Sequence, residues 1–129
     1  MNISKFTQKS VQAVQDLEKV AYEYGNQEIE QEHLLYTLLT QEDSLILKLI
    51  EKMEINKDYF IDTVKKALDA KVKVSGGELR FGQYLNKALV NAEDEAKAMG
   101  DEYVSVEHLF LSLLKYPSPG MKKIWSEFG

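Results

Sequence analysis

Two segments decide how this chain of 129 residues folds: QEHLLYTLL at residues 31–39 and VEHLFLSLL at residues 106–114. They are copies of one pattern 75 positions apart, so that His33 matches His108. Their leucines recur at the three- and four-residue spacing of a helix. The same offset also pairs Phe6 with Phe81, Ala13 with Ala88, Ala21 with Ala96, Gly25 with Gly100 and Glu32 with Glu107. An internal repeat of this length predicts a duplicated helical architecture.

Apolar spacing predicts four helices before residue 75. The first ends at Gly25, because glycine commonly terminates helices. The helix through residues 34–39 follows, and Ser44 and Asn56 are expected to cap two more. The inward-facing stripe of the first helix is Val14, Leu17, Ala21 and Tyr24, and that of the fourth is Phe60, Val64, Ala67 and Leu68. This spacing is typical of amphipathic helices.

The pattern returns after residue 80, with a stripe from Leu85 to Met99, a stop at Gly100 and a cap at Ser105. We therefore predict an all-α fold, in which two tandem repeats related by a pseudo-twofold axis form one bundle of about seven helices. The expected divisions are repeat 1 at residues 1–72, a linker at 73–79 and repeat 2 at 80–129. No strand is predicted, because the alternation at residues 71–74 is short.

The second repeat lacks a counterpart of the fourth helix, residues 57–70. This fits either a piece of a longer chain or a natural short protein. Each repeat is too small to bury much core alone, so we expect the two to share one core and form a single domain.

Composition limits the classes of function. The formal net charge is −5 and both halves are acidic, so no basic face for nucleic acid is expected. No apolar run is long enough to span a membrane, and the N-terminus does not resemble a secretory signal. Cysteine is absent, which excludes disulfides and cysteine–zinc sites. These features fit a cytoplasmic protein.

Four phrases carry a family resemblance: KFTQKS at residues 5–10, QEHLL at 31–35, KVSGG at 73–77 and GDEYVSVEHL at 100–109. Over essentially the whole chain they resemble the N-terminal domain of the Clp ATPases. The Ser75-Gly76-Gly77 linker is more similar to that of the ClpB protein disaggregases than to that of the ClpC branch.

The resemblance implies a substrate-binding module of a hexameric AAA+ unfoldase that captures unfolded or aggregated polypeptide. It implies a parent protein that uses ATP and Mg²⁺ and acts with a DnaK-type chaperone system. The module itself is expected to be a monomer without a cofactor. The sequence has no Gly-x-x-x-x-Gly-Lys-Ser/Thr phosphate loop, so no enzymatic activity is expected of this chain. The alternatives are an adaptor-docking domain of the ClpA or ClpC type and a free-standing regulatory protein.

The resemblance also implies binding residues. In ClpC relatives a pair of glutamates matching Glu32 and Glu107 holds the guanidinium of phosphoarginine, and a threonine in each repeat assists. Thr7 matches the first threonine, but Gly82 stands at the second, so phosphoarginine recognition is not expected. In ClpB relatives positions matching Thr7, Asp101 and Glu107 handle substrate.

An apolar groove between the repeats is the other implied binding feature, with Val14 and Leu89 at corresponding positions. Each of these residues also has a purely structural interpretation. Glu32 and Glu107 suit the first turn of a helix, Thr7 suits an N-cap, and Asp101 suits a turn. Val14 and Leu89 suit a buried core.

The two histidines raise the possibility of a metal site. His33 and His108 each follow a glutamate, but their spacing is not His-Glu-x-x-His. Repeat symmetry already accounts for their pairing, so we predict no metal and expect both to be structural histidines with hydrogen-bond partners.

Overall fold

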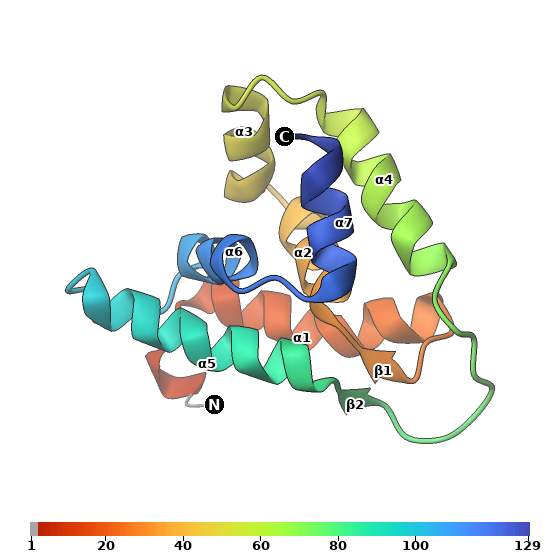
Figure 1. Cartoon of the computed structure of the whole chain (residues 1–129). Coiled ribbons are helices and arrows are strands. Elements are labelled where there is room, and N and C mark those ends of the chain that lie inside the picture. Colours follow the sequence, from red (N-terminus) through yellow and green to blue (C-terminus); the bar gives the residue numbers. More distant parts are fainter. Residues whose placement is uncertain (1–2) are drawn as a thin grey trace.

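The chain is a bundle of seven α-helices in the computed structural model, which describes residues 3–129 (Figure 1). The first repeat holds the 3₁₀ helix η1 (Ile3–Lys5), α1 (Gln8–Glu23), β1 (Glu28–Ile29), α2 (Gln31–Thr40), α3 (Leu45–Lys52) and α4 (Lys57–Asp69). The second holds β2 (Arg80–Phe81), α5 (Gln83–Ala98), α6 (Val106–Lys115) and α7 (Pro119–Glu127). The predicted all-α class and helix number are confirmed.

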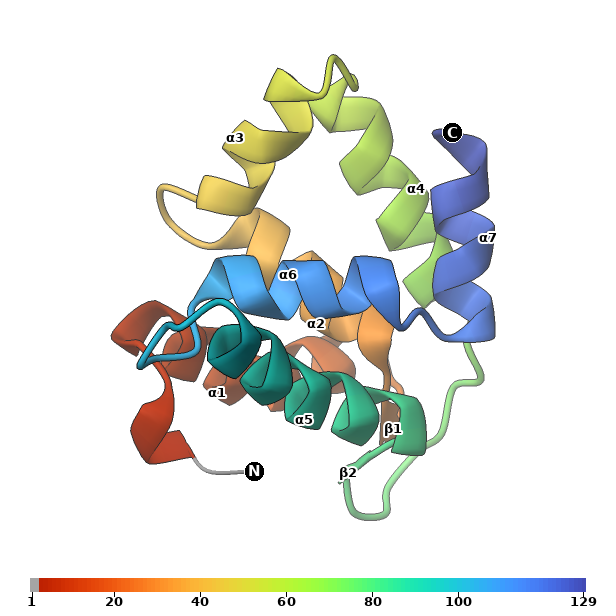
Figure 2. The ribbon, with the colours of Figure 1, turned by 60° about the vertical axis from the view of Figure 1, so that its left-hand side comes forward.

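The two repeats follow one plan. Helices α1 and α5 begin and end 75 residues apart, and so do α2 and α6. Helix α1 lies against α2 as α5 lies against α6, and Figure 2 shows α6 crossing above α5. Within residues 3–129, α4 has no counterpart in the second repeat.

Local sequence explains where the helices begin and end. Gly25 and Gly100 adopt φ values of 72° and 71°, the left-handed conformation in which a helix commonly ends. The side chains of Ser44 and Asn56 accept hydrogen bonds from the backbone amides of Leu47 and Tyr59. The predicted stops and these two caps are therefore confirmed.

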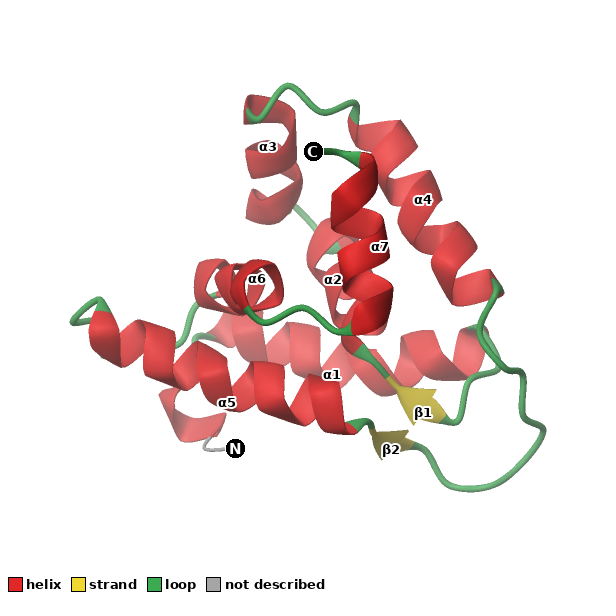
Figure 3. Cartoon of the chain, viewed as in Figure 1, coloured by secondary structure: helices red, strands yellow, loops and turns green. Residues whose placement is uncertain are grey.

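The expectation of no strand is wrong at one place. Two-residue strands β1 and β2 pair in parallel, Glu28 with Arg80 and Ile29 with Phe81 (Figure 3). A bridge between Phe6 and Val104 is the repeat-related image of the second pair. Each phenylalanine thus joins the opposite repeat and ties the two halves together. Strands this short leave no alternating pattern, so periodicity cannot reveal them.

The repeats share a single hydrophobic core, as their small size required. Leu34, Leu38, Leu109 and Leu113 are fully buried, and they come from both halves of the chain. Helix α4 closes one side through Phe60, whose ring stacks on Trp125 of α7 at 5.9 Å between centroids. No helix of the described part is long and apolar enough to cross a membrane.

Candidate functional site

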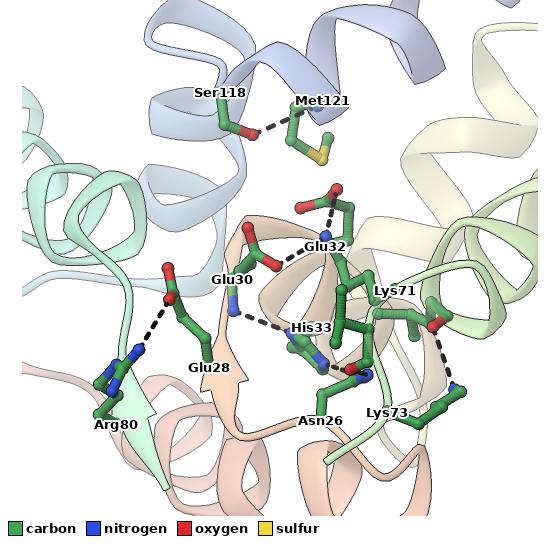
Figure 4. Close-up of polar contacts among 12 residues, drawn as sticks. Asn26, Glu28, Glu30, Glu32, His33, Lys71, Lys73, Arg80, Ser118 and Met121 are labelled. Atoms are coloured by element: carbon green, nitrogen blue, oxygen red, sulfur yellow. Dashed lines mark hydrogen bonds and ion pairs between the residues drawn. The ribbon is translucent and has the colours of Figure 1, made fainter.

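Both histidines are structural parts of the two helix starts at α2 and α6. His33 Nδ1 accepts the backbone N–H of Glu30 at 2.9 Å, so its Nε2 carries the proton and donates to Asn26 Oδ1 at 2.9 Å. His108 Nδ1 accepts the backbone N–H of Ser105 at 2.9 Å, and Nε2 lies 2.8 Å from Asp101 Oδ2. Asn26 and Asp101 are themselves 75 residues apart. Both ring nitrogens of each histidine are therefore used within the fold. Figure 4 shows His33 between Glu30 and Asn26.

Burial determines the protonation of His33. The side chain is fully buried, and its desolvation, with a smaller contribution from Lys71, lowers its pKa to about 4 from an ordinary 6.5. A proton on Nδ1 would also face the N–H of Glu30. His33 is therefore neutral in the folded chain at neutral pH.

Acid should destabilise the fold through this residue. In the unfolded chain His33 takes up a proton near pH 6.5, whereas in the folded chain it is protonated only near pH 4. Its contribution to the free energy of unfolding therefore falls by about 3 kcal/mol as pH drops through this window. Urea denaturation at pH 7 and pH 4 measures the loss. The variant Asn26→Asp places a carboxylate beside His33, as Asp101 lies beside His108, and should raise the pKa of His33. The variant should therefore lose less stability between pH 7 and pH 4 than the wild-type chain. Equal losses in the two proteins would mean that His33 is not the cause.

Glu32 occupies a buried position at the start of α2. Only 4% of the residue is exposed. Its Oε2 accepts a hydrogen bond from Lys71 Nζ at 2.9 Å, and the same ammonium donates to Glu30 Oε2 at 2.9 Å. Its Oε1 is buried and has no hydrogen-bond partner among the described residues. Such an orphaned buried oxygen is unusual in a folded protein.

A cavity of about 420 Å³ opens beside this carboxylate, between α4 and α7. Ala67 and Ile124 give it apolar walls, and Tyr59 and Lys123 also line it. Gly120 lets α7 approach, because a Cβ at this position would collide with Glu32 Oε2. The positive end of the α7 dipole thus lies near the carboxylate.

Glu107, the repeat partner of Glu32, is exposed. It lines a second cavity, of about 440 Å³, together with Thr7, Ser105 and Asp43. The structure therefore brings two of the predicted site residues together from opposite repeats. Thr7 is also the N-cap of α1, and its hydroxyl accepts the backbone N–H of Ser10 at 3.3 Å. The structural interpretation of Thr7 is thus confirmed, while its binding role stays a prediction.

The remaining predicted site residues lie elsewhere. Asp101 holds His108, as described above. Val14 and Leu89 are 7% and 1% exposed and belong to the hydrophobic core. A client could contact them only if the helices around them separated, so the apolar groove stays a prediction.

Gly82 marks the difference between the two repeats at the Thr7 position. It caps α5 with nearly the backbone angles that Thr7 has at α1, but it offers no hydroxyl. A Cβ here would lie 2.7 Å from Glu28 Oε1 and 3.3 Å from the carbonyl oxygen of Ile29. The pairing of β1 with β2 therefore leaves little room for a side chain, and no threonine-assisted site forms beside Glu32.

Comparison with known proteins agrees with this architecture. The model of the Clp repeat (R) N-terminal domain matches residues 5–128. The chaperone ClpB of Nitratidesulfovibrio vulgaris is 39% identical over 134 residues, which include 99% of this chain but only 16% of that protein. ClpB of Porphyromonas gingivalis is 40% identical over 114 residues, covering 88% of this chain and 13% of that protein.

Solved structures share the fold at lower identity. The Hsp104 N-terminal domain from Candida albicans has a TM-score of 0.84 and 21% identity over 95% of this chain and 81% of that chain. A complex of the ClpV N-domain with a VipB peptide has a TM-score of 0.75 and 18% identity, over 98% of this chain and 81% of that chain. With its duplicated helices and its full-length family match, the chain belongs to the Clp repeat N-terminal domain family.

Proposed function

We propose that this chain is the substrate-binding N-terminal module of a ClpB-type disaggregase, and that it binds unfolded or aggregated polypeptide weakly. The observation that carries this proposal is the open cavity that Thr7 of the first repeat and Glu107 of the second repeat both line. A carboxylate and a hydroxyl at the edge of an open cavity suit basic and polar groups of an extended chain. The ClpV N-domain bound to a VipB peptide supports peptide binding by this fold.

The function of the whole protein goes beyond this chain. Residues 1–129 match only 16% of the ClpB relative from Nitratidesulfovibrio vulgaris and contain a Clp N-terminal domain but no ATPase domain. We infer a homohexameric parent that uses ATP and Mg²⁺, works with a DnaK-type chaperone system in the cytoplasm and receives clients from this module. The module acts as a monomer that binds neither nucleic acid nor membranes.

Replacing Glu107 with glutamine tests the proposed site. Because Glu107 is exposed, an ion pair with a client contributes about 0.2–1 kcal/mol, which corresponds to a loss of affinity of roughly 1.4- to fivefold. Fluorescence anisotropy with a labelled, permanently unfolded polypeptide at physiological salt measures this loss. Glu102→Gln removes an exposed charge that does not line the cavity and should leave affinity unchanged.

Two results would count against the proposed function. Equal affinities of the Glu107→Gln and Glu102→Gln variants would remove Glu107 from the site. Binding of a folded adaptor protein, but not of the unfolded polypeptide, would favour the adaptor-docking alternative.

A further inference from the structure

The two repeat-related glutamates have unequal surroundings. Glu32 is buried against the ammonium of Lys71, whereas Glu107 is exposed beside an open cavity. Lys9 also lines the Glu107 cavity, but its ammonium donates to the backbone oxygen of Glu42 at 2.7 Å. A glutamate at the second position of the helix is thus paired with a lysine in the first repeat, whereas in the second repeat it is exposed and free to contact a ligand.

Lys71 is held firmly where it meets Glu32. The segment that follows Lys71 is held by two hydrogen bonds to the turn after α1. Asn26 Nδ2 donates to the carbonyl of Val72 at 3.1 Å, and the backbone N–H of Val74 donates to the carbonyl of Gly25 at 2.9 Å. The side chain of Lys71 is 15% exposed. The lysine is therefore presented to the carboxylate by an anchored backbone.

Lys71 contacts only one of the two carboxylate oxygens of Glu32. Lys71 Nζ contacts Glu32 Oε2, but Oε1 stays buried without a partner among the described residues, and Glu32 lines the 420 Å³ cavity. One ammonium faces two carboxylates, those of Glu30 and Glu32. Lys71, Glu30 and Glu32 together carry one net negative charge beside a cavity with apolar walls at Ala67 and Ile124. Lys66, Lys123 and Glu127 also line this cavity. A basic side chain, with its charge near the Glu32 carboxylate and its methylene groups against the apolar walls, fits this cavity.

We propose that Lys71 is a specificity-determining residue, whose ammonium occupies the Glu32 carboxylate in place of a basic side chain of a client. This inference rests on the proposed function. It makes the repeats unequal: the Glu107 cavity receives basic side chains, and the Glu32 cavity does so only when Lys71 is removed or displaced. The charge of Lys71 persists at neutral pH, because the opposing effect of burial on its pKa is outweighed by Glu32 and Glu30, which raise it.

Lys71→Met tests this, because methionine keeps an apolar stem of similar length and removes the charge. The probe is a capped leucine–arginine–leucine peptide, compared with its citrulline counterpart, which keeps the shape without the charge. The variant should prefer the arginine peptide by about tenfold, with NMR shifts at the amides of Glu32 and Gly120. The wild-type chain should show a much smaller preference, centred on Glu107.

Lys73→Met is the matched control, since Lys73 lies in the same segment and its ammonium donates to the carbonyl of Tyr24 at 2.6 Å. It should behave as the wild-type chain does. The double variant Lys71→Met/Glu32→Gln should fold but lose the arginine preference. The inference would be overturned if a folded Lys71→Met chain preferred the arginine peptide no more than the wild-type chain does. It would also be overturned if the NMR shifts of the variant lay away from Glu32.

The wild-type chain gives a second readout should Lys71→Met fail to fold. The ammonium resonance of Lys71 should stay in place when the arginine peptide saturates the wild-type chain, because Lys71 keeps the Glu32 carboxylate occupied while the peptide binds at Glu107. A shift of this resonance with the arginine peptide, but not with citrulline, would mean that Lys71 does not exclude the basic side chain and would overturn the inference. The proposed function is judged separately, by whether the wild-type chain binds an unfolded polypeptide at all.

Discussion

Replacing Phe60 with alanine should lower the free energy of unfolding by about 3–5 kcal/mol, the usual cost of emptying a buried aromatic site. Phe60 is fully buried. Its ring stacks on Trp125 at 5.9 Å and contacts Phe128 at 4.9 Å between centroids. These contacts join α4 to α7 and therefore join the first repeat to the second. Chemical denaturation followed by fluorescence of Trp125, the single tryptophan, measures the change.

Tyr59→Ala is the matched control for this prediction. Tyr59 is the neighbouring aromatic residue on α4, but it is 56% exposed, and it meets Phe128 edge-on at 5.5 Å. Its loss should cost far less than that of Phe60. Equal losses in the two variants would mean that α4 is not anchored through Phe60.

Replacing Lys71 with methionine should lower the free energy of unfolding by about 3 kcal/mol. The cost comes from leaving the carboxylate of Glu32 buried without its cation, rather than from the net value of the ion pair. Glu32 is 4% exposed, so water cannot easily take the place of the ammonium. Urea denaturation at pH 7 measures the loss.

Neutralising the carboxylate should restore most of this stability. In the double variant Lys71→Met/Glu32→Gln no buried charge is left unpaired, so its stability should return close to that of the wild-type chain. Equal instability of the single and double variants would mean that Lys71 stabilises the fold by its packing alone. Lys73→Met, which leaves Glu32 paired, should cost much less.

The helices could be predicted because their signals are local. The stripes from Val14 to Tyr24 and from Leu85 to Ala96, and the caps at Ser44 and Asn56, depend on residues within a few positions of each other. Met99, the last residue of the second predicted stripe, is instead 59% exposed. The duplication was visible for the same reason: Glu32-His33-Leu34 and Glu107-His108-Leu109 repeat at a fixed offset. The helix ends at Gly25, Ser44, Asn56 and Gly100 could therefore be read from short stretches of sequence.

The sequence carries a signal for the polar network around the histidines. Asn26 and Asp101 follow the paired glycines directly and share the 75-residue offset with His33 and His108. A short polar residue seven positions before each histidine pointed to a conserved geometry within this one chain. The two-residue strands gave no such signal, because they are too short for an alternating pattern.

The inequality of the two glutamates could not be predicted from the sequence. It depends on the tertiary path that carries Lys71 back to α2, 39 residues earlier in the chain, and on the close approach of α7 at Gly120. Neither contact follows from residue spacing. The repeat places Glu32 and Glu107 at equivalent helix positions, and the segment after α4 gives them different surroundings.

The most direct test of the proposed function is an NMR titration of the isotope-labelled chain with a permanently unfolded polypeptide at physiological salt. We expect amide shifts centred on Thr7, Ser105 and Glu107, with a dissociation constant on the order of micromolar to millimolar. The amides around Glu32 should move little while Lys71 remains in place. An absence of shifts at millimolar polypeptide would contradict client binding by this domain.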